Sequence, residues 1–372
     1  MLNPTAKTTA TAPAIVPPAP NINARGYVLM DANSGKVIAS KNMNTRRPPA
    51  SLTKLMTLYV TSQALANGQV KENDLVRISE KAWRRGGSRM FLKLGSHVPL
   101  IDLIHGIIVA SGNDACVATA EYIAGSEASF AQLMNQTAER LNMKNSHYVD
   151  STGLPKPNHY STPYDIAILT RALIKNFPDQ YKWYKQKWIT YNGIRQPNRN
   201  RLLWRDSSVD GLKTGHTDAA GYCLVSSGLR NNMRLIAVVM GTPSDEARAN
   251  DSEALLNWGF RFYKSYKVAD ASKPIAEPRV WMGRDRKVAL GLTHDLYITI
   301  PAGDYSRLKA TMTIQPKIEA PIEKGKAYGD ITVTLDDKLI SKTPVIALQD
   351  DERGGFWSRV SDHVALFFKK LI

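Results

Sequence analysis

The pattern of apolar and polar residues predicts a β-hairpin followed by helices in the first part of the chain. Gly26–Asp31 and Lys36–Ser40 have the composition of strands and flank a polar turn sequence that contains a glycine. From Ser51 onward, apolar residues recur at helical spacing, and the same period returns over Leu100–Ala110 and Phe130–Leu141. The first 150 residues therefore indicate a helix-rich region that begins with a hairpin.

Between Val209 and Met240 the pattern changes to that of buried strands. Apolar runs at Leu224–Val225 and Leu235–Met240 stand on either side of a polar turn. A helical period over Ser252–Phe262 closes this region. Helices followed by a group of strands predict an α+β domain.

After about Val268 the chain is predicted to form a separate, small all-β domain, because short strand patterns follow one another there. They lie at Asp295–Ile300, Leu308–Ile314, Ile331–Leu335 and Val345–Leu348. We therefore expect four parts: an extended N-terminal tether over residues 1–24, an α+β domain over 25–266, a β-rich domain over 267–350 and a terminal helix over 351–372.

The predicted helix at Phe356–Ile372 is amphipathic. Its apolar side carries Phe356, Trp357, Val360, Val364, Phe367, Phe368 and Leu371. Its polar side carries Arg359, Asp362, Lys369 and Lys370, with Leu366 as an exception among them. A bilayer span takes about 20 apolar residues, so this charged segment is too short and too polar to cross one. The pattern is typical of a helix that lies in a membrane interface, and the alternative is a helix docked on the protein's own surface.

Composition narrows the choice of partner only a little. Apolar residues make up 43% of the chain and charged residues 22%, as in soluble globular proteins. The formal net charge of +16 favours anionic partners, but no zinc-finger, Walker or aromatic RNA-binding motif accompanies it, so we expect no nucleic-acid partner. Cys116 and Cys223 have neither the spacing of zinc ligands nor that of a disulfide framework, and we expect no metal and no cofactor.

Three short motifs carry the candidate chemistry. Ser51-Leu52-Thr53-Lys54 is an SxxK motif, in which a helix places the hydroxyl and the amine on one face. Ser111-Gly112-Asn113 is an SxN motif, and Lys213-Thr214-Gly215 is the only K-[ST]-G sequence in the chain. Each motif alone is weak, since Ser306–Lys309 also fits SxxK. Together and in this order they are the signature of β-lactamases and penicillin-binding proteins.

The residues of these motifs suit nucleophilic acyl transfer. A serine hydroxyl becomes a good nucleophile only when a base takes its proton. We expect Ser51 to attack a scissile carbonyl and Lys54 to be the base, which requires a neutral lysine with a lowered pKa. Ser111 is expected to pass a proton to the leaving amine. The backbone N–H groups of Ser51 and His216 are expected to form the oxyanion hole.

The same motifs supply groups for substrate binding. Asn113 is expected to hydrogen-bond the substrate amide, and Thr214 to bind the substrate carboxylate. Lys213 is expected to keep the site positive and to help hold Lys54 neutral. Gly215 has no side chain, so a peptide could lie against this strand edge as an added strand.

A catalytic role could also be suggested for Glu139 and for Cys116, but we expect neither residue to take part in the reaction. Glu139 and Asn142 resemble the E-x-x-N of class A β-lactamases, but Glu139 falls opposite the apolar face of its predicted helix, so we expect it to be solvated. Cys116 follows Ser111 by five positions and is expected to be a small core residue.

The chain resembles the low-molecular-mass penicillin-binding proteins of the type-5 kind, which are D-alanyl-D-alanine carboxypeptidases. The resemblance covers nearly the whole chain after the N-terminal tether. It rests on Pro49–Lys54 (PASLTK), Ala110–Ala118 (ASGNDACVA), Gly193–Asn200 (GIRQPNRN), Asp210–Tyr222 (DGLKTGHTDAAGY) and Leu255–Phe262 (LLNWGFRF). It implies an α+β fold with a penicilloyl-serine-transferase (β-lactamase-like) domain, a small all-β domain and a C-terminal amphipathic helix that binds membrane.

The resemblance also implies the activity and the partners. The implied activity is that of a serine-type carboxypeptidase, which trims the terminal D-alanine from peptidoglycan pentapeptides through an acyl-serine intermediate. The implied partners are these stem peptides, and penicillin and other β-lactams, which would acylate the enzyme. Arg248 would join Thr214 in holding the substrate carboxylate, and Arg199 would lie near the site. The expected location is the periplasmic face of the bacterial inner membrane, with Phe356–Ile372 on the membrane surface.

Three other interpretations stay open at the level of sequence. The same fold with another acceptor would be a transpeptidase, an endopeptidase or a β-lactamase. A non-catalytic peptidoglycan-binding or scaffold protein would be expected to have a broken motif, and none is broken here. A basic nucleic-acid binder would rest on net charge alone.

Overall fold

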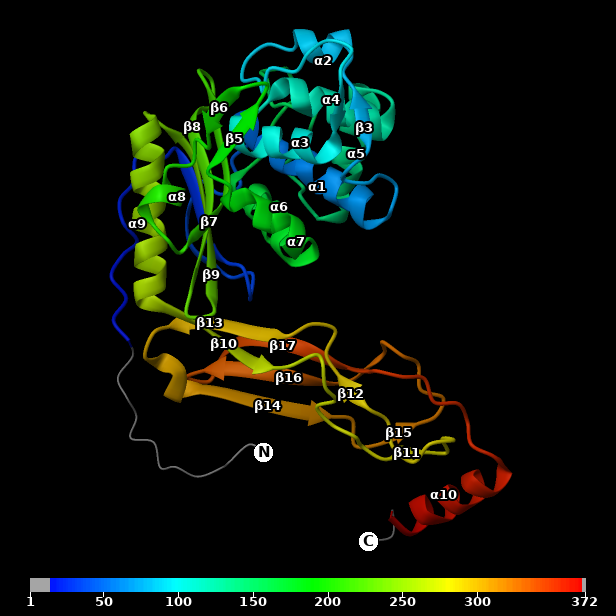
Figure 1. Ribbon diagram of the computed structural model, residues 1–372. Helices are drawn as coiled ribbons and strands as arrows, with labels where there is room; N and C mark the ends of the chain where they lie inside the picture. Colours follow the sequence, from blue (N-terminus) through cyan, green and yellow to red (C-terminus); the bar gives the residue numbers. More distant parts are fainter. Residues whose placement is uncertain (1–13, 370–372) are drawn as a thin grey trace. The chain divides into compact units, whose positions relative to one another are not determined.

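The structure is a computed structural model that describes residues 14–369, with side chains described throughout except at 358–359 and 365–369 (Figure 1). These residues form two compact units. The first comprises residues 17–261, and the second comprises residues 262–369 together with 14–16. Between residues 14 and 369, no helix is long and apolar enough to cross a membrane.

A five-stranded antiparallel sheet forms the centre of the first unit. Its strands are β1 (Gly26–Asp31), β2 (Val37–Lys41), β7 (Val209–Thr217), β8 (Gly221–Arg230) and β9 (Met233–Thr242). Their order is β2-β1-β9-β8-β7, so the predicted N-terminal hairpin joins the three later strands through the pairing of β1 with β9. Strand β7 lies at an edge of the sheet, and among the described strands it pairs with β8 alone.

Helices lie on both faces of this sheet, with α9 along one face and α1, α4 and α6 on the other side (Figure 1). The α-helices are α1 (Lys54–Ala66), α2 (Glu80–Arg84), α3 (Leu100–His105), α4 (Asn113–Ala124), α5 (Glu127–Arg140), α6 (Pro163–Asn176), α7 (Pro178–Tyr181), α8 (Leu202–Arg205) and α9 (Asp245–Phe262). Two 3-10 turns are η1 (Ala50–Thr53) and η3 (Lys182–Lys185), and η2 (Gly106–Ala110) is a π-helical turn. Two small strand pairs complete the unit: β3 (Leu75–Arg77) with β4 (His97–Pro99), and β5 (Trp188–Tyr191) with β6 (Ile194–Pro197).

Helix α1 is buried on every side. Each residue from Leu52 to Ser62 is buried, which is typical of a helix that runs through the middle of a core. The predicted helix from Ser51 is confirmed, and it starts with the 3-10 turn η1 before α1 begins. The turn that carries Ser51 is therefore continuous with a fully packed helix.

The helix predicted over Leu100–Ala110 is present as α3 followed directly by the π-helical turn η2. The turn ends at Ser111, whose backbone is left-handed, with φ 58° and ψ 36°. Serine adopts this conformation at a cost, and strained residues of this kind cluster at functional sites. Helix α4 starts two residues later, at Asn113.

Helix α9 begins at Asp245, seven residues before the predicted start at Ser252. The Ser244 hydroxyl accepts a hydrogen bond from the Ala247 backbone N–H at 3.0 Å, which caps the helix. Asp245 and Glu246 then lie in the first turn, where the helix dipole favours negative charge. The prediction was wrong here because this cap and acidic turn were not recognised, and the missed turns carry Arg248.

The predicted all-β region is confirmed in the second unit. Its strands are β10 (Tyr263–Ala269), β11 (Val280–Trp281), β12 (Leu290–Gly291), β13 (Leu296–Pro301), β14 (Leu308–Ile314), β15 (Ile318–Glu319), β16 (Ala327–Leu335) and β17 (Lys338–Ala347). They form a four-stranded sheet in the order β12-β17-β16-β14 and two strand pairs, β10-β13 and β11-β15. Buried apolar residues such as Ile300, Val333 and Val345 form one core for these sheets.

The amphipathic segment at the end of the chain forms α10 (Phe356–Lys369). Four residues of its predicted apolar side are exposed: Phe356, Trp357, Val360 and Val364, at 64%, 81%, 40% and 52% of their full areas. On its polar side, the Asp362 carboxylate accepts hydrogen bonds from Arg279 Nη2 and from the Met282 backbone N–H, each at 2.7 Å. The other predicted members of the two sides lie outside the described side chains: Arg359, Leu366, Phe367, Phe368, Lys369, Lys370 and Leu371.

Candidate active site

The Ser51 hydroxyl lies directly against the amine of Lys54. Lys54 Nζ donates hydrogen bonds to Ser51 Oγ and to the Thr152 carbonyl oxygen, each at 2.8 Å. The Lys54 side chain is completely buried, whereas Ser51 is partly exposed. Burial lowers the pKa of Lys54, and the charge of Arg199 lowers it further. The amine is thus in contact with the hydroxyl in an environment that favours its neutral form.

A second lysine lies against the second serine. Lys213 Nζ, on β7, donates to Ser111 Oγ at 2.9 Å and to the Thr214 carbonyl oxygen at 3.0 Å. Burial lowers the pKa of Lys213 well below its ordinary value, and the charges of Lys54 and Arg199 add to this effect. Because the charge on each buried amine affects the other, the two lysines titrate as a coupled pair, and an apparent pKa belongs to the pair and not to either residue.

A tight loop after Asp150 holds the carbonyl group that Lys54 uses. The Asp150 carboxylate accepts from the backbone N–H groups of Thr152 and Gly153, each at 2.8 Å. Gly153 has a φ of +84°, and a Cβ there would lie 1.8 Å from the Ala50 carbonyl oxygen. Only glycine therefore allows this loop to approach the turn that carries the candidate nucleophile.

Gly215 has a packing role of the same kind. A Cβ at this position would lie 3.2 Å from the Pro49 carbonyl oxygen and 3.3 Å from both Ala50 Cβ and Leu52 Cγ. The missing side chain allows η1 to pack closely on β7. The sequence suggested instead that Gly215 leaves room for a peptide along the strand edge.

An open pocket of about 200 Å³ brings most of the predicted residues together. Its walls include Ser51, Ser111, Arg199, Thr214, Gly215, His216 and Arg248. Lys54 and Lys213 are buried and reach two of these residues through the hydrogen bonds to the serine hydroxyls. Asn113 is buried, and its Nδ2 donates to the Gly86 carbonyl oxygen at 2.7 Å. Its Oδ1 has no hydrogen-bond partner among residues 14–369.

Two arginines line the pocket, and one of them, Arg248, forms an ion pair with Asp245, which lines it too. Arg248 Nη1 donates to the Gly215 carbonyl oxygen at 3.1 Å, and Arg248 is buried. Arg199 Nη1 donates to Ser88 Oγ at 2.9 Å. Thr214 also lines the pocket, so a hydroxyl and two guanidinium groups are available to bind an anionic ligand.

Sequence reasoning missed three residues of this pocket: Ser88, Tyr222 and Asp245. Asp245 forms an ion pair with Arg248 and a second one with Arg201, whose Nε lies 2.6 Å from its Oδ2. An acidic residue three positions before an arginine would have indicated this pair if the start of α9 had been placed correctly. Nothing in the sequence around Ser88 indicated its contact with Arg199.

The imidazole of His216 is exposed and stacks on the Tyr222 ring, with the ring centroids 3.9 Å apart. The backbone of His216 belongs to β7, which runs along the pocket from Thr214. The expected backbone role of His216 is compatible with this position.

Glu139 and the second SxxK sequence do not line this pocket, whereas Cys116 is buried within electrostatic range of Lys54 and Lys213. Glu139 is exposed and lines a separate cavity of about 320 Å³ with Asn142. The second SxxK sequence, beginning at Ser306, lies in the other compact unit. Cys116 is completely buried, and burial raises the pKa of its thiol to about 12. Within the described part of the chain, no group of histidine, cysteine and acidic residues is arranged to hold a metal.

Comparison with known proteins matches nearly the whole chain. Residues 9–244 match a family described as D-alanyl-D-alanine carboxypeptidase, and residues 263–353 match the C-terminal domain of penicillin-binding protein 5. The D-alanyl-D-alanine carboxypeptidase DacA of Escherichia coli (strain K12) is 44% identical, over 95% of this chain and 90% of its own length.

Solved structures agree with these sequence matches. Penicillin binding protein 5 from Haemophilus influenzae superimposes with a TM-score of 0.85 at 42% identity, over 91% of this chain and 100% of that one. Penicillin-binding protein D2 from Listeria monocytogenes, in its ampicillin-bound form, gives a TM-score of 0.61 at 27% identity, over 66% of this chain and 100% of that one.

These matches confirm the predicted fold, with its catalytic domain followed by an all-β domain, and the predicted enzyme class. The chain belongs to the D-alanyl-D-alanine carboxypeptidase family of serine peptidases.

Proposed function

We propose that this protein removes the terminal D-alanine from peptidoglycan pentapeptide stems by two successive acyl transfers at Ser51. The observation that carries the proposal is the 2.8 Å hydrogen bond between the buried Lys54 amine and the Ser51 hydroxyl, at a pocket that two arginines line. This arrangement suits a substrate with a free C-terminal carboxylate next to the bond that is cleaved.

The first transfer acylates the serine. Lys54 Nζ takes the proton of the Ser51 hydroxyl as Oγ attacks the carbonyl carbon of the penultimate D-alanine. The backbone N–H groups of Ser51 and His216 stabilise the oxyanion. The C–N bond then breaks, and the proton that Lys54 had taken reaches the leaving nitrogen with Ser111 as the relay. D-alanine therefore departs as an amine, Ser111 still holds one hydroxyl proton, and Lys54 is neutral again.

The second transfer releases the shortened peptide. Water attacks the acyl-serine carbonyl, and Lys54 takes one of its protons. When the ester bond breaks, that proton returns to Ser51 Oγ. The sum of the two steps consumes one water and yields the shortened peptide and D-alanine. The exposed position of Glu139, outside this pocket, gives no support to a β-lactamase that uses a glutamate for this step.

The bound substrate is expected to determine which of the two buried lysines is protonated. Its carboxylate is expected at Thr214, on the strand that carries Lys213, and at Arg248, on α9. A negative charge there favours a protonated Lys213. Repulsion between two buried ammonium groups then favours a neutral Lys54, which is the form that can act as a base.

The chain's location is proposed from α10 and from its relatives. The helix exposes Phe356, Trp357, Val360 and Val364 while Asp362 binds the protein's own surface. An exposed apolar strip that includes two aromatic residues suits the membrane interface. We therefore place the protein on the periplasmic face of the bacterial inner membrane, where its peptidoglycan substrate lies. The ampicillin-bound relative supports acylation of this chain by β-lactams.

We predict that Ser51→Ala lowers D-alanine release by at least about a thousandfold and abolishes covalent labelling by penicillin, because no other hydroxyl among the described side chains is hydrogen-bonded to Lys54. Labelled penicillin and diacetyl-lysyl-D-Ala-D-Ala are the two probes, and mass spectrometry locates the adduct. Ser306→Ala, in the second SxxK sequence, is the matched control and should behave as the wild type. An adduct on a serine other than Ser51 would refute the assignment.

We predict that penicillin acylation slows as pH falls, with an apparent pKa below the ordinary lysine value of 10.5. The sign follows from the mechanism, since acylation needs neutral Lys54 and burial lowers the pKa of that amine. The measurement is the second-order acylation rate across pH. Lys54→Arg, which cannot lose its proton, should be inactive at every pH. An inflection at the ordinary lysine value would contradict the proposal.

We predict that Arg248→Ala lowers kcat/KM about 10- to 100-fold for a peptide with a free C-terminal carboxylate, and much less for its C-terminal amide, because it removes a charged hydrogen bond. Arg205→Ala is the matched control, since Arg205 is paired with Glu246 on the same helix as Arg248 but does not line the pocket. Equal losses on the two peptides would exclude a role for Arg248 in carboxylate recognition.

We predict that the double substitution Trp357→Glu and Val364→Glu abolishes co-sedimentation with anionic liposomes and leaves D-alanine release from a soluble peptide unchanged. Both side chains are exposed on α10, and charge opposes their insertion into the interface. Leu339→Glu, at another exposed apolar residue of the same unit, is the control and should still bind. Liposome binding by the double variant would show that α10 is not the anchor.

A further inference from the structure

Two tryptophans form an exposed aromatic corner on the unit that carries the active site. Trp188, on β5, is 42% exposed, and Trp204, on α8, is 43% exposed. Their ring centroids lie 6.0 Å apart and their planes meet at 84°, so the rings are edge to face. Neither ring lines the active-site pocket. Large apolar side chains that stay exposed next to one another, unlike scattered ones, indicate a binding surface.

Two cations accompany this corner. Arg195 Cζ lies 4.2 Å from the centroid of the Trp188 ring, and Lys187 Nζ lies 5.8 Å from the centroid of a Trp204 ring. Both cationic residues are exposed. No carboxylate among the described side chains forms an ion pair with either of them, so both charges are available to a ligand.

The β5–β6 hairpin presents most of these groups on one face. Successive residues of a strand point to opposite faces, and Ile189 is buried whereas Trp188 and Thr190 are exposed. In the antiparallel register, Trp188 pairs with Pro197 and Thr190 pairs with Arg195. The outer face of the hairpin therefore combines an aromatic ring, a proline ring, a hydroxyl and a guanidinium.

This face lies close to the active-site pocket. Arg199 lines that pocket, and Pro197, the partner of Trp188 in the hairpin, precedes Arg199 by two positions. An extended chain rises by about 3.3 Å per residue and paired strands lie about 5 Å apart, so the backbones of Trp188 and Arg199 are within about 12 Å of each other. Trp204 follows Arg199 by five positions. A polymer bound at the corner is therefore held beside the site of reaction.

We propose that the Trp188–Trp204 corner binds the glycan strand of peptidoglycan, a polymer of N-acetylated pyranose sugars. The face of an aromatic ring carries partial negative charge, and the C–H bonds on the face of a β-linked pyranose carry partial positive charge, so the two stack. Arg195 and Lys187 complete the match. The lactyl group of every second sugar ends in a carboxylate wherever its stem peptide has been removed, and both cations can bind that group.

The form of the corner favours a sugar over a lipid. Trp357, on the helix that we propose to lie in the membrane interface, is 81% exposed and can insert. Trp188 and Trp204 are about half as exposed, because each packs against the other and against a cation. They offer ring faces at the protein surface, which suit a flat sugar ring.

The inference rests on the proposed function, since the glycan belongs to the polymer that carries the proposed substrate, and it adds a second contact with that polymer. A stem peptide in the active site and a glycan at the corner are two linked binding events, so each raises the effective concentration for the other. The corner is expected to speed turnover of stem peptides on the polymer and not of free peptides.

The first test measures binding of peptide-free glycan strands, prepared from bacterial sacculi with an amidase. The double substitution Trp188→Ala and Trp204→Ala should weaken this binding about tenfold or more, since tryptophans are the anchors whose truncation costs most. Trp83→Ala is the matched control, because Trp83 is 40% exposed on α2 and has the Arg84 guanidinium 5.9 Å from its ring centroid. It should bind as the wild type does. Replacement of both corner tryptophans by phenylalanine, which keeps a ring, should retain most of the binding.

The second test compares D-alanine release from pentapeptide-rich sacculi and from soluble diacetyl-lysyl-D-Ala-D-Ala. The double alanine variant should be about tenfold slower than the wild type on sacculi and equally fast on the soluble peptide, which also shows that it is folded.

Three results would overturn the glycan site. They are glycan binding that survives the double alanine substitution, wild-type binding of polyglutamate as tight as that of glycan, and a loss of liposome binding in the double variant while glycan binding persists. Failure of the wild type to release D-alanine from the soluble peptide would contradict the proposed catalytic function instead, and it is distinguishable because glycan binding is measured without turnover.

Discussion

The proposed chemistry of this protein depends on the burial of one lysine amine beneath one serine hydroxyl. Lys54 contributes a side chain with no exposed area, and its amine touches Ser51 Oγ at 2.8 Å. The contact exists because η1 and α1 are continuous and because α1 is packed on every side. A surface helix with the same four residues would leave the lysine solvated and protonated, and the serine would have no base.

Much of the surrounding structure maintains that burial. The Asp150 loop supplies the carbonyl group for the second hydrogen bond of Lys54, and Gly153 allows the loop to approach. Gly215 allows β7 to pack on the serine turn from the other side. The buried amine has a cost in stability, because the unfolded chain binds protons on lysine more readily than the folded one does. That cost is present at neutral pH and declines as pH rises from the lowered pKa of the folded state to the ordinary lysine value, so stability increases with pH over that window.

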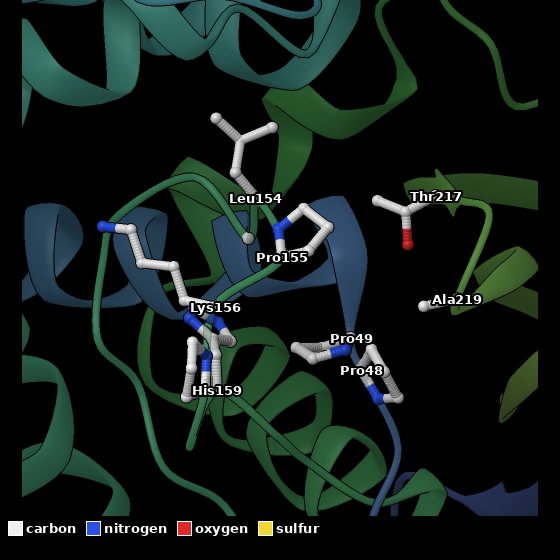
Figure 2. A pocket seen from close by; sticks show the side chains of 10 residues that line it. Pro48, Pro49, Leu154, Pro155, Lys156, His159, Thr217 and Ala219 are labelled. Carbon is white, nitrogen blue, oxygen red and sulfur yellow. The ribbon is translucent and has the colours of Figure 1, made fainter.

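Much of this arrangement could be predicted from the sequence, because its determinants are local. The SxxK spacing on a helix, the apolar run into Ser111 and the strand around Lys213 each depend on near neighbours, and the structure places all three as expected. Arg199 and Arg248 came only from the family resemblance, since their approach to the pocket depends on long-range packing. Asp245 was missed because the start of α9 was placed too late, which hid its helical relation to Arg248. A cavity of about 340 Å³ is lined by Pro48, Leu154 and Ala219 (Figure 2), which are more than 50 residues apart in the chain, and no local pattern indicates their meeting.

The most direct test of the account is to titrate the Lys54 amine itself in the folded protein. Nuclear magnetic resonance of protein labelled with 13C at lysine Cε reports each amine's protonation, and Lys54→Met assigns the signal. The account predicts a resonance, absent from the variant, that titrates below 10.5, the ordinary value for lysine. If the Lys54 signal titrated with the solvated lysines, the amine would be protonated at neutral pH, and it could not be the base that activates Ser51.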